Sequence, residues 1–385
     1  MKKIAAIQLI ASLFFVCGGA AYAAEPKSVE RIVNELIPPL MAENSIPGMA
    51  VAVSIEGQRY FFNFGEASKE SGQKVTEKTL FEIGSISKAF TATLAAYAQE
   101  TGHLSLADQA GVYLPELRGS HLERVSLLDL GTYAAGGLPL QFPPEVDNEA
   151  KMTAYFQAWR PSYAAGSHRL YSNPSIGLFG YLAARSLGAP FDELMEGTLL
   201  PGLGLADTYI RVPEERMGDY AWGYSKEGRP VRVKPGVLDS EAYGIKTNSS
   251  DLLSYLEANM GEAILAAELQ AALETTHSGY FKVGGMTQGL GWESYDYPVS
   301  LETLLAGNSG QIMLQANELS RFDPPLPPRS RALYNKTGST NGFGAYVAFV
   351  PDRKIGLVLL ANKNYPNADR IKVLHQILSA LDQQQ

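Results

Sequence analysis

Two residues near position 85 give the first chemical signal in the sequence. Ser85 and Lys88 lie three positions apart within segment 81–90, and apolar residues at helical spacing follow until a stop signal at Gly102. In a helix this spacing places the lysine amine one turn from the serine hydroxyl. A serine hydroxyl is a poor nucleophile until a neighbouring group accepts its proton, and this lysine could do so. The alternative is that Ser85 only caps a helix and that Lys88 is solvated.

A second polar segment consists of Tyr171, Ser172 and Asn173, and a segment with helical spacing follows it. Asn173 followed by Pro174 is a favoured helix start, so helix capping would explain the asparagine. Capping does not explain Tyr171, a polar aromatic residue beside it. The segment therefore remains a candidate for chemistry as well as for capping.

A third segment, Lys336, Thr337, Gly338 and Ser339, closes a β-rich stretch. A strand that ends in a turn would explain Gly338. A strand that presents a cation and a hydroxyl also suits a substrate carboxylate, and glycine allows a ligand to approach closely. The backbone N–H of Ser339 could join that of Ser85 in an oxyanion hole.

The three motifs, Ser-x-x-Lys, Tyr-x-Asn and Lys-Thr-Gly, occur in this order along the chain. In this combination the sequence resembles the penicillin-recognising serine enzymes. Tyr171–Asn173 as the second motif looks like class C, the serine cephalosporinases among the β-lactamases. The resemblance covers roughly residues 33–381. Four further stretches that are similar to this class are 136–141, 241–244, 288–293 and 361–367.

The resemblance implies a hydrolase that opens the β-lactam ring of cephalosporins and penicillins and so confers resistance to them. Ser85 would form an acyl-enzyme, Lys88 and Tyr171 would share the proton transfers, and water would then hydrolyse the ester. Ammonium groups of Lys88 and Lys336 near the phenol would favour its ionised form, whereas desolvation would oppose it. Whether Lys88 or Tyr171 is the base in each step is left open. The implied catalytic residues are Ser85, Lys88, Tyr171, Lys336 and Ser339.

The resemblance also implies the residues that bind the substrate. Gln141 and Asn173 match positions that hold the amide side chain of the substrate, and Tyr243 matches a wall of the side-chain pocket. The alternative for Tyr243 is a half-buried aromatic residue in a loop. Lys336, Thr337, Asn367 and Arg370 match positions around the substrate carboxylate. Gly338, in the same motif as Lys336, is also an implied substrate-binding residue. An arginine at a helix start can also be merely solvated.

The elements that must position these residues follow from hydrophobic patterning. Segments 48–54 and 60–64 are β-rich and are separated by Glu56-Gly57, which predicts a hairpin. Near the C-terminus the same pattern returns in segments 332–336, 345–350 and 355–361. Helical spacing of apolar residues predicts a helix in 28–43 and a closing helix in 371–381.

These elements predict a fold of the α/β class, of the α+β type. An antiparallel sheet is built from both chain ends and flanked by helices, with an inserted, mostly helical lobe, as the resemblance to the β-lactamase/transpeptidase-like fold also implies. We expect one catalytic unit, residues 24–385. Its sheet lobe would comprise about 25–84 and 300–385, and its helical lobe about 85–299. The site would lie in the crevice between the lobes.

The first 23 residues have the pattern of a secretory signal peptide. Lys2 and Lys3 form a basic start, residues 4–16 are apolar, and a cleavage pattern predicts processing after Ala23 or Ala24. The apolar stretch is short for a membrane span of about 20 residues. We therefore expect export to the periplasm and no membrane association after cleavage.

Composition argues against other classes of protein. The 385-residue chain has 40 acidic and 32 basic residues and a net charge of -8, which disfavours a nucleic-acid partner. Neither a metal nor a cofactor is expected. Cys17, the single cysteine, lies in the predicted signal peptide, and the five histidines (103, 121, 168, 277 and 375) lack ligand spacing. The expected partners are β-lactam antibiotics, and a monomer is the default expectation.

Two alternatives use the same nucleophile. One is a D-Ala-D-Ala carboxypeptidase or esterase, and the other is a sensor that is acylated but never turns over. Lys336-Thr337-Gly338, with the stretches around Gln141 and Asn367, favours the β-lactamase. A sensor would normally carry a membrane segment or a signalling domain, and the sequence gives no sign of either.

Overall fold

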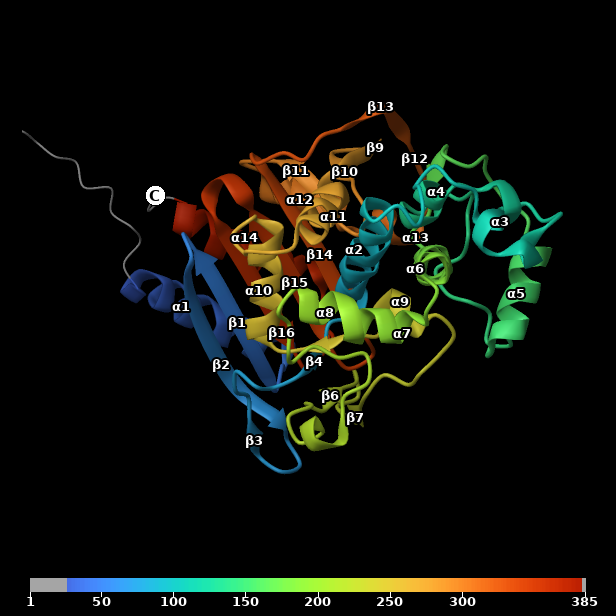
Figure 1. The fold of residues 1–385 in the computed structure, drawn as a ribbon. Coiled ribbons are helices and arrows are strands. Elements are labelled where there is room, and N and C mark those ends of the chain that lie inside the picture. The colour runs from blue at the N-terminus through green and yellow to red at the C-terminus, as the bar shows by residue number, and fades with distance from the viewer. Residues whose placement is uncertain (1–25, 383–385) are drawn as a thin grey trace, which may run out of the picture.

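The fold is built around one large antiparallel sheet (Figure 1). The computed structural model describes residues 26–382, and within them ten strands pair in the order β13-β9-β10-β11-β14-β15-β16-β1-β2-β3. The strands are β1 (Gly48–Ile55), β2 (Gln58–Ser68), β3 (Gln73–Lys74), β9 (Gly279–Val283), β10 (Met286–Gln288), β11 (Glu293–Asp296), β13 (Ser320–Leu326), β14 (Ala332–Ser339), β15 (Gly344–Val350) and β16 (Ile355–Ala361). Since β1 and β16 are neighbours, the prediction of a sheet built from both chain ends is confirmed.

The first hairpin forms at the predicted turn. Glu56 and Gly57, which join β1 to β2, have φ values of 50° and 79°. A two-residue turn with positive φ at both positions matches the twist of the strands that it connects. Strand β1 is buried along its whole length, because elements cover both faces of the sheet.

Helices form a layer on each face of this sheet, as Figure 1 shows for α1 and for the helical lobe on the opposite side. Met49, Val51 and Val53 pack with α1 and α14, whereas the alternate residues Ala50 and Ala52 pack in the cluster that contains α10. The longer helices are α1 (Pro26–Asn44), α2 (Ser87–Glu100), α5 (Glu149–Ala158), α6 (Asn173–Leu187), α10 (Ser249–Asn259), α11 (Ala267–His277), α12 (Leu301–Gly307) and α14 (Asn367–Asp382).

Short elements complete the helical lobe and the connections. The short helices are α3 (Ala110–Tyr113), α4 (Leu127–Gly131), α7 (Phe191–Leu194), α8 (Leu200–Gly202), α9 (Asp239–Tyr243) and α13 (Gly310–Leu314). The two-stranded sheets are β4 (Phe81–Glu82) with β8 (Lys246–Thr247), β5 (His168–Arg169) with β12 (Asn317–Glu318), and β6 (Gly223–Tyr224) with β7 (Pro230–Val231).

The predicted boundary of the helical lobe needs a correction. The lobe was expected to extend to residue 299, but residues 279–296 form β9, β10 and β11 of the main sheet, beside β14. These strands have only five, three and four residues, and glycines lie in the turns between them. Alternation over so few residues is too short to identify a strand from the sequence.

The predicted signal peptide, its cleavage after Ala23 or Ala24, and Cys17 lie outside the described residues. Among residues 26–382, no helix combines the length and apolar character needed to cross a membrane.

Candidate active site

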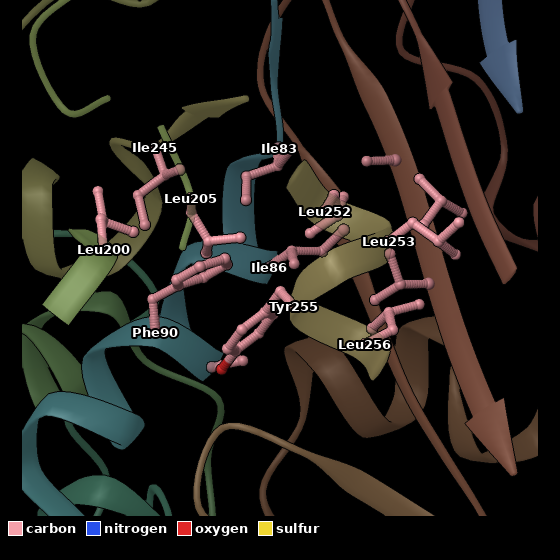
Figure 2. Close-up of a cluster of buried hydrophobic side chains, with 14 of the residues drawn as sticks. Ile83, Ile86, Phe90, Leu200, Leu205, Ile245, Leu252, Leu253, Tyr255 and Leu256 are labelled. Carbon is pink, nitrogen blue, oxygen red and sulfur yellow. The ribbon is translucent and has the colours of Figure 1, made fainter. Parts of the chain in front are cut away.

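The turn that carries Ser85 is anchored by apolar side chains. Ser85 lies in a 3₁₀ turn, η1 (Gly84–Ile86), which runs directly into α2. Ile86 and Phe90 point into a buried cluster, where Phe90 stacks on Tyr255 with ring centroids 3.9 Å apart (Figure 2). Apolar packing on one side therefore fixes a turn whose serine lines a cleft on the other side.

Two glycines allow the end of β14 to lie against this turn. Gly84 has a φ of 51°, and a β-carbon there would lie 2.4 Å from the backbone nitrogen of Ser339. A β-carbon on Gly338 would lie 1.9 Å from the carbonyl oxygen of Ile83. The sequence suggested that Gly338 admits a ligand, but the group that approaches it is the backbone of the turn. The backbone nitrogen of Ser339 is thereby placed beside the turn of Ser85.

Lys88 contacts Ser85 directly, in the geometry that the three-residue spacing predicts. Its Nζ donates hydrogen bonds to Ser85 Oγ at 2.9 Å and to the carbonyl oxygen of Ala242 at 2.6 Å. The side chain is fully buried, and neither acceptor is a carboxylate. Burial lowers the pKa of Lys88 to about 8, although the nearby Tyr171 acts in the opposite direction.

Tyr171 lies between two lysines. Lys88 Nζ is 5.2 Å and Lys336 Nζ is 5.0 Å from the centroid of the Tyr171 ring. Burial alone would raise the pKa of Tyr171, but the charges of Lys336 and Lys88 outweigh it and bring the pKa to about 8. The hydroxyl makes no hydrogen bond of good geometry within residues 26–382. It is therefore available to exchange a proton with a group that enters the site.

Lys336 differs from Lys88 because a carboxylate faces it. Its Nζ lies 3.4 Å from Oε1 of Glu293, and Arg169 lies 3.2 Å from the same oxygen. Burial would lower the pKa of Lys336, but Glu293 and Tyr171 raise it above the usual value. Lys336 consequently stays charged. The guanidinium of Arg169 also lies 5.4 Å from the Tyr171 ring, so three cations surround that phenol.

Helix α6 is capped by Ser172 and not by Asn173. Ser172 Oγ accepts a hydrogen bond from the Ser175 N–H at 3.0 Å, because Asn173 is already the first residue of the helix. The capping explanation for Asn173 is therefore wrong. Its side-chain oxygen is buried and has no partner within the described part of the chain. Its backbone N–H donates to the carbonyl oxygen of Leu140, which holds the loop of Gln141 beside it.

A cleft of about 540 Å³ opens at Ser85. Five predicted residues from separate segments line it: Ser85, Gln141, Asn173, Tyr243 and Ser339. The other residues that line it are Val231, Arg232, Val233, Lys234, Thr340, Asn341 and Asn364. Lys88, Tyr171 and Lys336 are buried at the site, exposed by at most 3% of their surface.

A second cavity, of about 790 Å³, adjoins this cleft, since Ser339 and Asn364 line both. Asn367 lines the second cavity, where its amide lies 3.4 Å from the sulfur of Met313. Thr337 is buried in β14 beside Lys336. The predicted residues thus divide between the cleft, the adjoining cavity and the buried end of β14.

Arg370 is not placed to contact a substrate carboxylate. It is fully buried and lines neither cavity. Its guanidinium donates to the carbonyl oxygen of Gly338 at 2.8 Å, to Ser339 Oγ at 2.9 Å and to Asn364 Oδ1 at 2.7 Å. Burial lowers its pKa to about 10. Because α14 packs against the sheet, this arginine holds the end of β14 from behind and is a positioning residue.

Two residues of the site carry no signal of their own in the sequence. Arg169 was not considered, and Glu293 was only part of a matching stretch. Arg169 and Glu293 lie 124 positions apart and meet only in the folded chain. The one available signal for Arg169 was its position two residues before Tyr171. Within residues 26–382, no group of three or more His, Cys, Asp or Glu side chains is arranged to hold a metal ion.

Comparison with known proteins identifies the family. Residues 33–382 match the family model described as Beta-lactamase, and the chain belongs to this family. It is 57% identical over 355 residues to a β-lactamase of Pseudomonas fluorescens, covering 92% of this chain and 99% of that protein. It is 43% identical over 359 residues to a β-lactamase of Escherichia coli strain K12, covering 93% and 95%.

Solved structures support the same assignment. A class C β-lactamase in complex with cefoxitin matches with a TM-score of 0.90 and 51% identity, covering 92% of this chain and 99% of the other. A protein from Pseudomonas syringae described as a β-lactamase/D-alanine carboxypeptidase matches with a TM-score of 0.90 and 48% identity, covering 91% and 99%. The predicted resemblance to class C enzymes and the predicted fold are both confirmed.

Proposed function

We propose that this protein is a class C serine β-lactamase, which hydrolyses the ring of cephalosporins and penicillins and so confers resistance to them. The observation that carries the proposal is the position of Tyr171 between Lys88 and Lys336, beside a serine that opens onto a cleft. The similarity to class C β-lactamases over nearly the whole described chain supports it.

In the first step, Ser85 Oγ attacks the carbonyl carbon of the ring and its proton passes to the pair formed by Lys88 and Tyr171. Each member of this pair has a pKa of about 8, so one proton is shared at little cost near neutral pH. The carbon–nitrogen bond of the ring breaks, the nitrogen takes up the proton, and an ester on Ser85 remains. Backbone N–H groups of Ser85 and Ser339 stabilise the oxyanion.

In the second step, water attacks the ester and Ser85 leaves as the alcohol. The phenolate of Tyr171, which the charges of Lys336 and Lys88 favour, accepts a proton from the water. The proton then returns to Ser85 Oγ through the same pair. The products are the ring-opened acid and the regenerated enzyme.

The substrate would be held at both ends. Lys336 and Thr337 attract the substrate carboxylate, with Gly338 and Asn367 near the same end of the site. Gln141 and Asn173 hold the amide of the acyl side chain, and Tyr243 forms a wall beside it. A buried acceptor without a partner, such as Asn173 Oδ1, costs free energy until a donor reaches it, so an amide N–H gains affinity there.

Turnover of a chromogenic cephalosporin tests this function. The proposal expects sustained hydrolysis by the purified protein and loss of turnover in Ser85→Ala, with an unchanged circular dichroism spectrum. Hydrolysis by Ser85→Ala at the parental rate would show that Ser85 is not the nucleophile. A single burst without turnover would indicate a sensor instead.

A second candidate is D-alanine carboxypeptidase activity, because a similar solved structure is described with both names. The same serine would attack the peptide carbonyl before the terminal D-alanine. Release of D-alanine from a peptide ending in D-Ala-D-Ala measures it. A higher kcat/KM for the peptide than for the cephalosporin would make the peptidase the main function.

We further propose that the enzyme is exported, acts in the periplasm and is a monomer. The signal-peptide pattern of residues 1–23 supports export to the periplasm, whereas the monomer is the default expectation. Release by osmotic shock, with a mature N-terminus after Ala23 or Ala24 by mass spectrometry, is the expected result. Light scattering of the purified enzyme should give the mass of one chain.

A further inference from the structure

A cavity of about 920 Å³ lies outside the catalytic cleft, between α6, α7 and α9. It shares no lining residue with the cleft. Its walls combine aromatic side chains, among them Tyr113, Tyr181 and Phe191, with charged groups. Nothing in the proposed hydrolysis uses this cavity.

The most unusual group in this wall is the carboxyl of Glu241. The residue is only 6% exposed, and its side chain lies against Gly180 of α6, where a β-carbon would be 3.0 Å from Glu241 Cγ. Apart from its own backbone N–H, no group within residues 26–382 donates a hydrogen bond to the carboxyl. A buried carboxyl without a partner side chain is costly, and a bound donor would remove that cost.

The charge of the cavity favours a cationic ligand. Four carboxyl groups line it, and of these only Asp192 has an ion pair in the described chain, with Arg211 at 3.5 Å. Glu149 accepts a hydrogen bond from Tyr181, and Glu193 is exposed at the rim. The one lining arginine, Arg185, is engaged by the carbonyl oxygen of Tyr113 at 2.8 Å.

The same short helix connects this cavity with the catalytic site. Helix α9 spans Asp239–Tyr243, and Glu241 lines the cavity while Tyr243 lines the catalytic cleft. Between them, the carbonyl oxygen of Ala242 accepts the 2.6 Å hydrogen bond from Lys88 Nζ. The carbonyl oxygen of Glu241 itself accepts a hydrogen bond from Thr91 of α2 at 2.6 Å. Glu241 is thus the residue directly before Ala242, whose carbonyl oxygen accepts the hydrogen bond from Lys88. A ligand that moves Glu241 could therefore also move this acceptor.

We propose that this cavity is a second ligand site, which binds a planar organic cation such as an aromatic amidinium against Glu241. We also propose that its occupancy changes catalysis through α9. The aromatic walls stack on the flat part of the ligand, and the amidinium donates to the buried carboxyl. This site goes beyond the hydrolytic function and does not depend on which β-lactam is the substrate.

Binding of benzamidine to the intact protein, measured by isothermal titration calorimetry, tests the site. The neutral isostere benzamide is the control ligand, and it should bind at least about tenfold more weakly because it cannot form the charge-assisted hydrogen bond. Equal affinities for the two ligands, or no binding of benzamidine, would overturn the proposal.

Two variants locate the ligand. Glu241→Gln keeps the shape but removes the charge, and should weaken benzamidine binding by about tenfold or more. Ala189→Phe keeps every carboxyl and fills the cavity, so it should also abolish binding. It remains informative if the first variant does not fold. Glu77→Gln, an exposed carboxyl that lines no part of this cavity, is the matched control and should bind as the parent does.

The pH dependence provides a further test. Burial raises the pKa of Glu241 to about 8, with Asp192 and Asp239 acting in the same direction and Arg211 against them. The permanently charged Arg185 also lines the cavity. Because the ligand binds the ionised carboxyl, its affinity should rise with pH up to about 8 and then level off. An affinity that falls between pH 6 and 8 would contradict binding at Glu241.

Steady-state kinetics test the connection through α9. Saturating benzamidine should change kcat/KM for a chromogenic cephalosporin by about fivefold or more in the parent, as is typical of coupled sites. The change should be absent in Ala189→Phe, whose activity without ligand should match the parent. Calorimetric binding without any kinetic change in the parent would overturn the coupling. Since calorimetry needs no turnover, failure of this site is distinguishable from failure of the hydrolytic function.

Discussion

The site contains two buried lysines, Lys88 at the start of α2 and Lys336 near the end of β14. Both lie beside Tyr171, but the groups that accept their hydrogen bonds differ. Lys88 and Lys336 lie at almost equal distances from the Tyr171 ring. The acceptors of Lys88 are a hydroxyl and a backbone carbonyl, whereas Lys336 faces the carboxylate of Glu293. Burial therefore dominates at Lys88 and lowers its pKa, while Glu293 and Tyr171 raise the pKa of Lys336.

This difference separates two tasks that a single lysine could not perform. A lysine with a pKa near neutral can take up and release a proton during turnover, whereas a lysine held by a carboxylate remains a fixed positive charge. The fixed charge keeps the pKa of Tyr171 low, and in the proposed mechanism it also attracts the substrate carboxylate. The partner of each lysine, and not its residue type or depth of burial, decides its role.

Removal of the proton-exchanging lysine should have the largest effect. Lys88→Met should lower kcat/KM for a chromogenic cephalosporin by about 10³-fold, since general acid–base groups typically contribute 10²–10⁴-fold. The loss should lie mainly in kcat, because Lys88 contacts the nucleophile and not the bound drug. Stopped-flow acylation rates and steady-state kinetics measure it.

Lys246 provides the matched control for Lys88. It is also buried, its pKa is lowered by burial, and its Nζ donates to the backbone carbonyl oxygens of Ile210 and Gly244. Lys246→Met should reduce the melting temperature but leave kcat within about threefold of the parent, because removing a buried lysine affects stability and not a proton transfer. A loss as large as that of Lys88→Met would show that burial alone, and not contact with Ser85, makes a lysine important.

Removal of the fixed charge should have a smaller and different effect. Lys336→Met should lower kcat/KM by about 10²-fold, with KM contributing most of the change, because an ion pair to the substrate carboxylate is lost. The pKa that governs the acidic limb of the pH–rate profile should also rise, since Tyr171 loses a neighbouring positive charge. An unchanged KM would contradict the role of Lys336 in binding the substrate carboxylate.

The pH profile reports on the proton that Lys88 and Tyr171 share. In the parent, kcat/KM should fall by about tenfold per pH unit below an apparent pKa near 8, because the pair of Lys88 and Tyr171 must first lose a proton. Glu293→Gln removes a negative charge that raises the pKa of Tyr171, so this limb should move to lower pH. A shift to higher pH would mean that Glu293 acts mainly through the protein scaffold.

Of these substitutions, Tyr133→Phe should have the smallest effect on kcat. Tyr133 packs on Tyr171 with ring centroids 4.7 Å apart, and its buried hydroxyl has no partner within residues 26–382. Burial and the neighbouring acidic groups raise its pKa, so it stays protonated. Tyr133→Phe should therefore keep kcat within about twofold, because deleting an unpaired buried hydroxyl is nearly neutral. A tenfold loss would extend the proton network beyond Tyr171.

Local sequence signals predicted the parts of the site that depend on short spacing. Ser85 and Lys88 are three positions apart, about one helical turn, and the structure places the two side chains in contact. The hairpin at Glu56-Gly57 and the end of α6 at Gly188 also follow from residue types that permit positive φ.

Features that depend on the folded chain could not be predicted in this way. Glu293 and Arg169 act on Lys336 from separate segments, and neither lies in a motif with a known spacing to it. The resemblance implied that Arg370 lies near the substrate carboxylate, and the alternative was a solvated arginine, but α14 turns Arg370 onto the sheet. Asn173 followed by Pro174 also allowed a helix cap, but Ser172, one residue earlier, takes that role.

The central claim is that Ser85 becomes covalently acylated at a site controlled by two unequal lysines. Mass spectrometry of the intact protein after brief mixing with a slowly hydrolysed cephalosporin, followed by peptide mapping, tests it most directly. The account predicts one added drug-derived mass on the peptide that contains Ser85, and its loss over time in the parent. Ser85→Ala should show no adduct. An adduct on another residue, or sustained hydrolysis with no adduct at Ser85 at any time, would contradict the account.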